Sequence, residues 1–247
     1  MSASLTANDN HLIKMDEFEG YTVNGEKLQF DTKFDRYGYQ TRSGTIHDSA
    51  TLPKGSRVYV HYFIADKLIE GFGLHYTDDS LIYAYSHDGK VTMMEDYVFV
   101  QPVDISESSE HIIYSEKKEA GKILFLPEIT NGLEEGDIIR FTEKSDLKMT
   151  IEGVEGYLMR MDRDIVCHKD YTCIGSWMLV EALDESEWRE EGGLLLPGSA
   201  PLHVGKVKHG KDEGKSIVYP KKSYNMIDGM YAIKENHVML ELITNNK

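Results

Sequence analysis

A threefold internal repeat is the feature of this sequence that most constrains its fold. Three landmarks recur in one order: a glycine that opens a short β-rich run, a glycine turn that leads into a second run, and a polar turn followed by an apolar run. The first landmark is found at Gly44-Thr45-Ile46, Gly121-Lys122-Ile123 and Gly205-Lys206-Val207, and the second is centred on Gly55, Gly136 and Gly214. The third is assigned to Glu95–Val100, Asp162–Val166 and Glu235–Leu240. Self-similarity at a fixed period indicates a repeated structural unit, and glycine adopts turn conformations that strain other residues.

The residues between the landmarks predict strands. Short runs rich in Val, Ile, Tyr and Phe alternate with polar turns, the pattern of antiparallel sandwiches and barrels. Leu81–Tyr85 and Val91–Met93 flank the pair Asp88-Gly89, which predicts a hairpin. No helical periodicity extends beyond about two turns. We therefore expect an all-β protein of tandem small β-barrels, because a barrel closes its sheet edges without needing a large core.

The repeat predicts three domains, at residues 1–96, 97–175 and 176–247. The segment Tyr97–Val103 has three interpretations: it ends the first barrel, begins the second, or crosses between them. The second and third landmarks lie much further apart in the first repeat than in the second. We therefore expect an insertion around Asp66–Ser80.

Charge and composition exclude several classes of partner. The formal net charge is −15, which opposes binding to nucleic acid or to an anionic membrane, because both require a concentrated basic surface. No apolar run approaches the roughly 18 residues of a membrane helix, and the polar stretch Met1–Asn10 does not resemble a signal peptide. Only two cysteines occur in 247 residues, which favours a reducing compartment. We expect a cytoplasmic protein.

Few residue patterns indicate chemistry. Cys167-His168 and Cys173 supply too few ligands at metal-site spacing, so we expect Cys167 to be a buried thiol. The ten histidines form no metalloprotease-like motif, and Gly71-Phe72-Gly73 lacks the strand–helix context of a dinucleotide site. No serine nucleophile elbow is present. We predict no catalytic residues, no metal and no cofactor, and expect that the chain is not an enzyme.

The segment before the third repeat is the most informative for function. An acidic stretch leads into Gly192-Gly193, followed by Leu194-Leu195-Leu196 and then Pro197–Ala200. Glycine pairs and a nearby proline make a poor strand interior, and consecutive leucines in a mobile loop indicate a partner contact. The alternative is that the leucines form a buried strand that covers the barrel.

This segment resembles a known family. Gly192–Ala200, followed by Gly205-Lys206-Val207, is similar to the mobile loop and next strand of the GroES family, the co-chaperonins that cap the chaperonin cage. Tyr231–Leu242 is similar to that family's final hairpin. The resemblance covers residues 176–244, and it extends to the earlier repeats only through their landmarks. It implies that Gly192 and Gly193 form the hinge, and that Leu194, Leu195 and Leu196 insert between helices of a GroEL-like chaperonin ring. It also implies a homo-oligomeric ring that encloses unfolded client proteins.

The departures from the family pattern leave two functions open. Gly205 and Gly214 are too close together for the family's long roof hairpin, so the cap would have an open top, as in some phage-encoded co-chaperonins. His111–Tyr114 occupies the loop position of the second repeat without a Gly-Gly hinge, and Gly25–Phe30 in the first is polar. Only the third loop matches the docking pattern. We expect a co-chaperonin that assists protein folding, and the alternative is a structural or assembly protein, for instance of a virus particle, that reuses the barrels.

Overall fold

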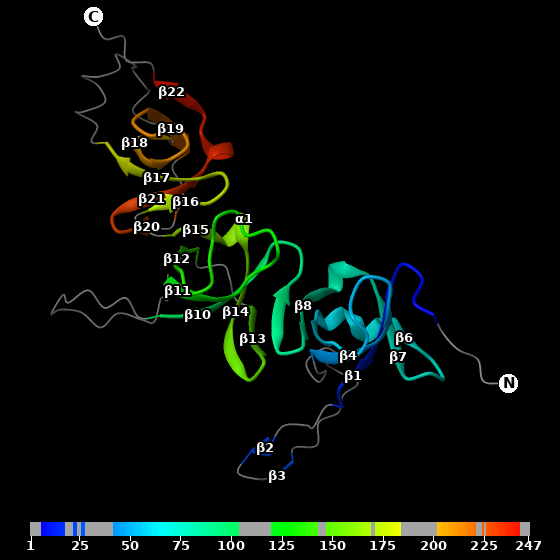
Figure 1. Cartoon of the computed structure of the whole chain (residues 1–247). Helices are drawn as coiled ribbons and strands as arrows, with labels where there is room; N and C mark the ends of the chain where they lie inside the picture. Colours follow the sequence, from blue (N-terminus) through cyan, green and yellow to red (C-terminus); the bar gives the residue numbers. More distant parts are fainter. Residues whose placement is uncertain are drawn as a thin grey trace, which may run out of the picture. The chain divides into compact units, whose positions relative to one another are not determined.

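The computed structural model describes residues 6–17, 22–23, 26–27, 42–103, 120–142, 147–168, 171–183, 202–220, 224 and 226–242. These residues form antiparallel sheets with only short helical turns, so the predicted all-β class is confirmed (Figure 1). The chain divides into two compact units, residues 1–97 with 125–129, and residues 98–124 with 130–247. No helix of the described residues is long and apolar enough to cross a membrane.

The first sheet has seven strands in the order β6-β7-β1-β4-β5-β8-β9. Its strands are β1 His11–Met15, β4 Ser43–Ser49, β5 Arg57–Val60, β6 Leu68–Ile69, β7 Leu74–Thr77, β8 Ile82–His87 and β9 Lys90–Met93. The 3-10 helices η1 (Tyr62–Lys67) and η2 (Asp79–Leu81) precede β6 and β8. Two further short strands, β2 (Thr22–Val23) and β3 (Glu26–Lys27), pair with each other between β1 and β4.

The second sheet also has seven strands, in the order β13-β14-β10-β11-β12-β15-β16. Its elements are β10 Tyr97–Pro102, β11 Ala120–Phe125, β12 Ile138–Phe141, β13 Leu147–Ile151, β14 Val154–Arg160, α1 Met161–Asp164, β15 Ile165–His168 and β16 Thr172–Cys173.

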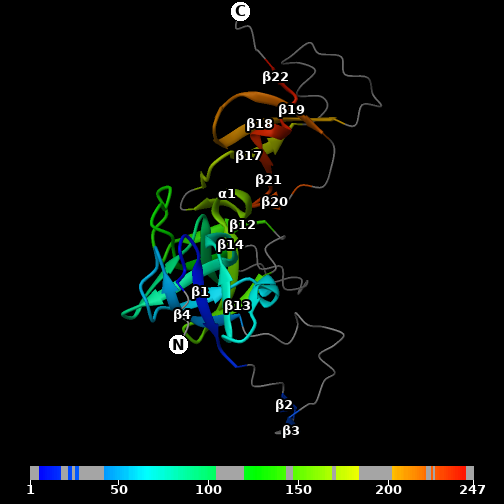
Figure 2. The same ribbon diagram turned by 90° about the vertical axis from the view of Figure 1, so that its right-hand side faces the viewer.

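The third sheet has six strands in the order β20-β21-β17-β18-β19-β22, and Figure 2 shows it from the side. Its elements are β17 Trp177–Ala182, β18 Leu202–Gly210, β19 Ser216–Pro220, β20 Met226–Ile227, β21 Met230–Lys234, η3 Glu235–His237 and β22 Leu240–Leu242.

The three sheets share one strand topology. In each sheet the first strand (β1, β10 or β17) lies between a hairpin (β6–β7, β13–β14 or β20–β21) and the second strand (β4, β11 or β18). The second strand also pairs with the third (β5, β12 or β19). The third pairs in turn with the strand that follows a short helical turn (β8, β15 or β22). The repeat inferred from the landmarks therefore corresponds to a repeated strand order. The division into domains at 96/97 and 175/176, and the closure of each sheet as a GroES-like barrel, stay predictions.

The landmark glycines lie at equivalent places for two physical reasons. Gly44, Gly121 and Gly205 lie within the second strand, near its start, where it lies close to the first. An added Cβ would lie 2.7, 2.9 and 2.7 Å from a carbonyl oxygen of the first strand in the three cases. Gly55, Gly136 and Gly214 have φ of +86°, +94° and +87°, which glycine adopts readily and other residues only with strain. Each donates its N–H back to the second strand, to Ile46, Ile123 and Val207 at 2.8–2.9 Å.

The landmark glycines also orient the core. Ile46, Ile123 and Val207 each follow a first-landmark glycine by two residues, and each is at most 1% exposed. Successive side chains in a strand point to opposite faces, so this spacing places an aliphatic residue inward in every repeat. The predicted hairpin is also confirmed, because β8 pairs with β9 around Asp88 and Gly89, both at positive φ.

The third landmark was misassigned in the first repeat. Glu95–Val100 belongs largely to β10, which is a strand of the second sheet. The element equivalent to α1–β15 and η3–β22 is η2–β8, because β8 pairs with β5 as β15 pairs with β12. Both β8 and β10 follow acidic turns and are apolar, so the local pattern did not distinguish them. Tyr97–Val103 thus begins the second sheet.

The expected insertion around Asp66–Ser80 is also wrong. This segment contains the β6–β7 hairpin, which corresponds to β13–β14 and β20–β21 in the other sheets. The interval in the first repeat is long only when it is measured to the misassigned third landmark. β8 begins 27 residues after Gly55 and β15 begins 29 residues after Gly136, and the hairpin strand β9 has its counterpart in β16.

Candidate partner-binding site

The predicted docking residues Gly192, Gly193, Leu194, Leu195 and Leu196 lie outside the described residues. The chain on either side shows where their segment leaves the sheet. β17 ends at Ala182 and β18 begins at Leu202, and these strands are antiparallel neighbours with Ala182 opposite Gly205. The two ends of segment 184–201 are therefore attached to adjacent strands at the same end of the third sheet.

Apolar residues hold these two ends together. The Leu183 N–H donates to the Val204 carbonyl oxygen at 3.0 Å. The partly buried Leu183 and Leu202 pack against Val204 and Val218, which are 4% and 0% exposed. We call these four residues the loop root. Its apolar packing gives segment 184–201 a fixed attachment on the sheet.

The first and second repeats attach their own segments with the same backbone hydrogen bond. Asp16 N donates to Ser43 O at 3.0 Å, and Val103 N donates to Ala120 O at 3.1 Å. In all three repeats the acceptor immediately precedes the first-landmark glycine. The attachment of a segment between the first two strands is therefore a property of the repeat.

The attachment in the first repeat is ionic rather than apolar. The Asp16 carboxylate accepts hydrogen bonds from the Ser43 hydroxyl at 2.6 Å and from Arg57 at 2.9 Å. The polar segment predicted there, Gly25–Phe30, is described only at Glu26–Lys27, which forms β3. His111–Tyr114 of the second repeat lies outside the described residues. The third repeat thus differs from the first in the polarity of its attachment as well as in its loop sequence.

An aromatic cluster lies beside the loop root. The His203 ring lies 5.6 Å from the Tyr219 ring, and Tyr219 lies 5.7 Å from Tyr224 and 6.4 Å from Tyr231. Tyr219 is fully buried, and burial raises its pKa to about 12. Large aromatic rings bury much apolar surface and pack in restricted geometries, so the cluster stabilises the sheet beneath the loop root.

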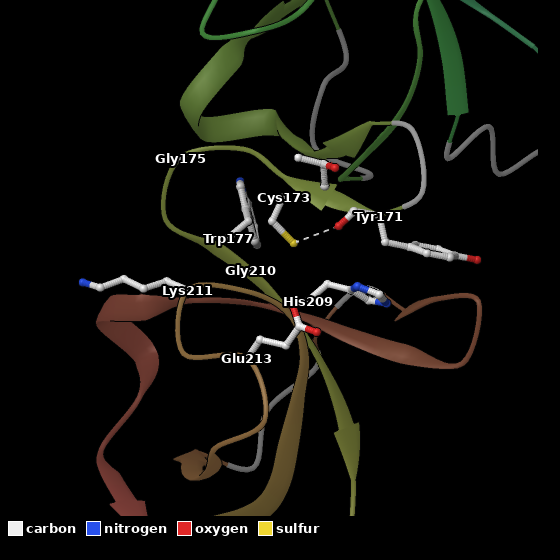
Figure 3. Close-up of a pocket in the computed structure, with 9 residues that line it drawn as sticks. Tyr171, Cys173, Gly175, Trp177, His209, Gly210, Lys211 and Glu213 are labelled. Atoms are coloured by element: carbon white, nitrogen blue, oxygen red, sulfur yellow. Dashed lines mark hydrogen bonds between the residues drawn. The ribbon is translucent and has the colours of Figure 1, made fainter.

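A pocket of about 390 Å³ lies at the opposite end of the β17–β18 pair (Figure 3). It is lined by Tyr171, Thr172, Cys173, Gly175, Trp177, His209, Gly210, Lys211 and Glu213. The Cys173 thiol donates to the Tyr171 carbonyl oxygen at 3.6 Å, and Figure 3 shows the Lys211 side chain extending away from that thiol. Burial raises the pKa of Cys173 to about 11. The thiol is therefore protonated near neutral pH and is a poor nucleophile there.

The predicted buried thiol at Cys167 is confirmed. Cys167 is 1% exposed, and burial raises its pKa to about 12. It lies opposite Cys173 in the β15–β16 pair, and both cysteines are free. Within the described ranges, no three His, Cys, Asp or Glu side chains are grouped as metal ligands. The absence of a metal and of a cofactor stays a prediction for the whole chain.

The comparisons with known proteins add no assignment to this geometry. No protein-family model matches the chain, and no curated protein matches it. The function is therefore argued from the residues, the repeated topology and the loop root.

Proposed function

We propose that this protein is a cytoplasmic, non-enzymatic co-chaperonin made of tandem GroES-like barrels. It docks on a chaperonin ring through Leu194, Leu195 and Leu196, with Gly192 and Gly193 as the hinge, and it assists the folding of client proteins. The observation that carries the proposal is the loop root. A leucine-rich segment begins and ends on adjacent strands whose ends are held by Leu183, Leu202, Val204 and Val218.

This attachment suits reversible docking. A segment anchored at both ends reaches its partner without a change in the sheet, so ordering on binding is confined to the segment itself. Burial of three leucines contributes about 1.5–3 kcal/mol each before costs, and ordering a flexible segment removes several kcal/mol. One loop is therefore a weak binder, and a homo-oligomeric ring of loops binds strongly because each later contact is effectively intramolecular.

The three repeats have different roles in this proposal. The third repeat carries the docking segment on an apolar root, whereas the ionic attachment around Asp16 and Arg57 belongs to a polar segment. The first two repeats then contribute to the wall of the cap. The formal charge of −15 suits a hydrophilic chamber, which does not retain apolar clients.

The test is binding of the full-length chain to a GroEL-type chaperonin ring in the presence of nucleotide. We expect the wild-type chain to co-elute with the ring in size-exclusion chromatography and Leu195→Asp to lose co-elution. The matched control is Ile113→Asp, which places the same charge in the hingeless segment of the second repeat and retains binding. Equal co-elution of wild type and Leu195→Asp would exclude the docking role.

The second candidate is a structural or assembly protein that reuses the same barrels, for instance in a virus particle. The ionic attachment in the first repeat favours it, because a chain specialised for docking has no evident need of a hingeless, polar loop. In this case segment 184–201 would be ordered on a neighbouring copy. Chaperonin with nucleotide would then leave the native mass of the wild-type protein unchanged.

A further inference from the structure

The second and third sheets pack against each other within one compact unit, through residues that we call the repeat interface. Val166 and Cys167 of β15 form one cluster with Leu179 of β17 and with Ile227 and Ala232 of the β20–β21 hairpin. These five side chains are between 0% and 2% exposed. Figure 1 shows β20 and β21 next to β15. The third repeat therefore contributes β17 and the β20–β21 hairpin to this interface, and the second repeat contributes β15.

Polar contacts surround this apolar centre. Arg140 of β12 contacts Asp228 in the turn between β20 and β21 at 3.0 Å, and the Tyr171 hydroxyl donates to Asp228 at 2.9 Å. The Lys234 ammonium donates to the Asp162 carbonyl oxygen at 3.1 Å. An apolar centre with a polar rim is typical of a specific interface.

The third sheet exposes residues at the positions that the second sheet buries in this interface. Arg140 and Val218 each follow their second-landmark glycine by four residues. Cys167 lies opposite Arg140, and Leu240 lies opposite Val218, so Leu240 corresponds to Cys167 and Met239 to Val166. Val166 and Cys167 are 0% and 1% exposed, whereas Met239 and Leu240 are 56% and 52% exposed.

The first sheet exposes the hairpin part of the other half of the interface, whereas Leu12, the equivalent of Leu179, is only 3% exposed. Tyr76 of the first sheet corresponds to Ala232 of the third, because Tyr76 pairs with Leu12 and Ala232 pairs with Leu179. Leu12 and Leu179 are equivalent because each lies three residues before the residue that pairs with the first-landmark glycine. Ala232 is 2% exposed, whereas Tyr76 is 45% exposed. Phe72, in the turn of the equivalent hairpin, is 47% exposed.

We propose that copies of this chain bind each other head to tail by repeating their own repeat interface. The β6–β7 hairpin of one copy, with Phe72 and Tyr76, packs against the β19–β22 edge of the next copy, with Met239 and Leu240. The partner that fits each of these surfaces is a second copy of this chain. Both halves of the interface occur on one chain, and the second and third sheets already bury the equivalent positions against each other. Exposed apolar residues that cluster at such positions mark a protein contact.

This contact is heterologous, since two different surfaces meet. A heterologous contact generates a closed ring when the rotation per copy closes and an open filament when it does not. The inference deepens the proposed function, on whose ring of copies it rests, by naming the two surfaces that meet, and the same contact would serve the structural candidate. It involves neither Leu194–Leu196 nor a chaperonin.

The test uses two surface variants of the full chain, Tyr76→Glu on the hairpin and Leu240→Glu on the edge. We expect the wild type to form assemblies by native mass spectrometry at micromolar concentration, and each variant alone to be a monomer. In an equimolar mixture, the Leu240→Glu chain supplies an intact hairpin and the Tyr76→Glu chain supplies an intact edge. One contact can then form between them, so the mixture forms a dimer and nothing larger. Far-UV circular dichroism checks that both variants keep the β fold.

Ile129→Glu is the matched control, because Ile129 is 77% exposed and lies on neither face. We expect it to assemble like the wild type. A monomeric wild type, single variants that stay assembled, or a mixture that stays monomeric would each overturn the inference. No chaperonin is present in this experiment, so its failure is distinct from failure of the docking test.

Discussion

The Arg140 guanidinium contacts both carboxylate oxygens of Asp228, at 3.3 and 3.0 Å, and so joins β12 of the second sheet to the β20–β21 turn of the third. The same carboxylate accepts a hydrogen bond from the Tyr171 hydroxyl, and this bond raises the pKa of Tyr171. One acidic residue in a two-residue turn therefore contacts two residues of the preceding repeat. The contact adds orientation to an interface whose centre is apolar.

The Arg140–Asp228 pair should contribute modestly to stability. Its side chains are 24% and 39% exposed, and exposed ion pairs are worth about 0.2–1 kcal/mol. We expect a double-mutant cycle of Arg140→Ala and Asp228→Ala, followed by urea denaturation, to give a coupling energy in that range. A coupling near zero would show that the pair does not stabilise the repeat interface.

Gly205→Ala should be strongly destabilising. The added Cβ would lie 2.5 Å from Val180 Cγ1 and 2.7 Å from the Glu181 carbonyl oxygen, and the backbone oxygen cannot move aside without disturbing the β17–β18 pair. Overpacking costs about 1–3 kcal/mol, and we expect the upper end of that range in the free energy of unfolding.

Gly214→Ala is the matched control for this prediction. Gly214 has nothing within 4 Å of an added Cβ but has a φ of +87°, so only backbone strain of about 1–2 kcal/mol is expected. If chemical denaturation shows the Gly205 variant to be no less stable than the Gly214 variant, close strand approach is not the reason for the first landmark.

Tyr219→Phe should leave stability unchanged or raise it by up to about 1 kcal/mol, because a buried hydroxyl without a partner carries a desolvation cost. The Tyr219 hydroxyl is buried and has no hydrogen-bond partner among the described residues. The measurement is the midpoint of urea denaturation at neutral pH. A loss of stability would show that this hydroxyl is hydrogen-bonded.

The cysteines predict a loss of stability at alkaline pH. Burial raises the pKa of Cys167 from an ordinary value of 9.0 to about 12. Between these values the folded state binds the thiol proton more tightly than the unfolded state does, so stability falls as the pH rises above 9. We expect Cys167→Ala to have a shallower decline than the wild type when urea denaturation is measured between pH 8 and 11. Parallel curves would contradict the assigned pKa.

Local steric requirements were predictable from the sequence. The two landmark glycines of each repeat are needed for a close strand approach and for a positive φ, and both needs depend on a few adjacent residues. The hairpin at Asp88-Gly89 was predictable for the same reason. The docking loop remains a prediction from sequence, because Gly192–Leu196 lie outside the described residues and the structure contributes only the apolar loop root.

The sequence by itself determined the all-β class, the threefold repeat and the positions of the landmark glycines in or just before a strand. Only the tertiary structure decided that β8 rather than β10 pairs with β5, because both runs are apolar and the choice depends on pairing between residues distant in the sequence. The burial of Cys167 was predicted, but only the tertiary structure showed which residues cover it and that Met239 and Leu240, at the equivalent positions of the third sheet, are exposed. Burial of a side chain depends on which surface packs over it, and that surface is supplied by residues far away in the sequence.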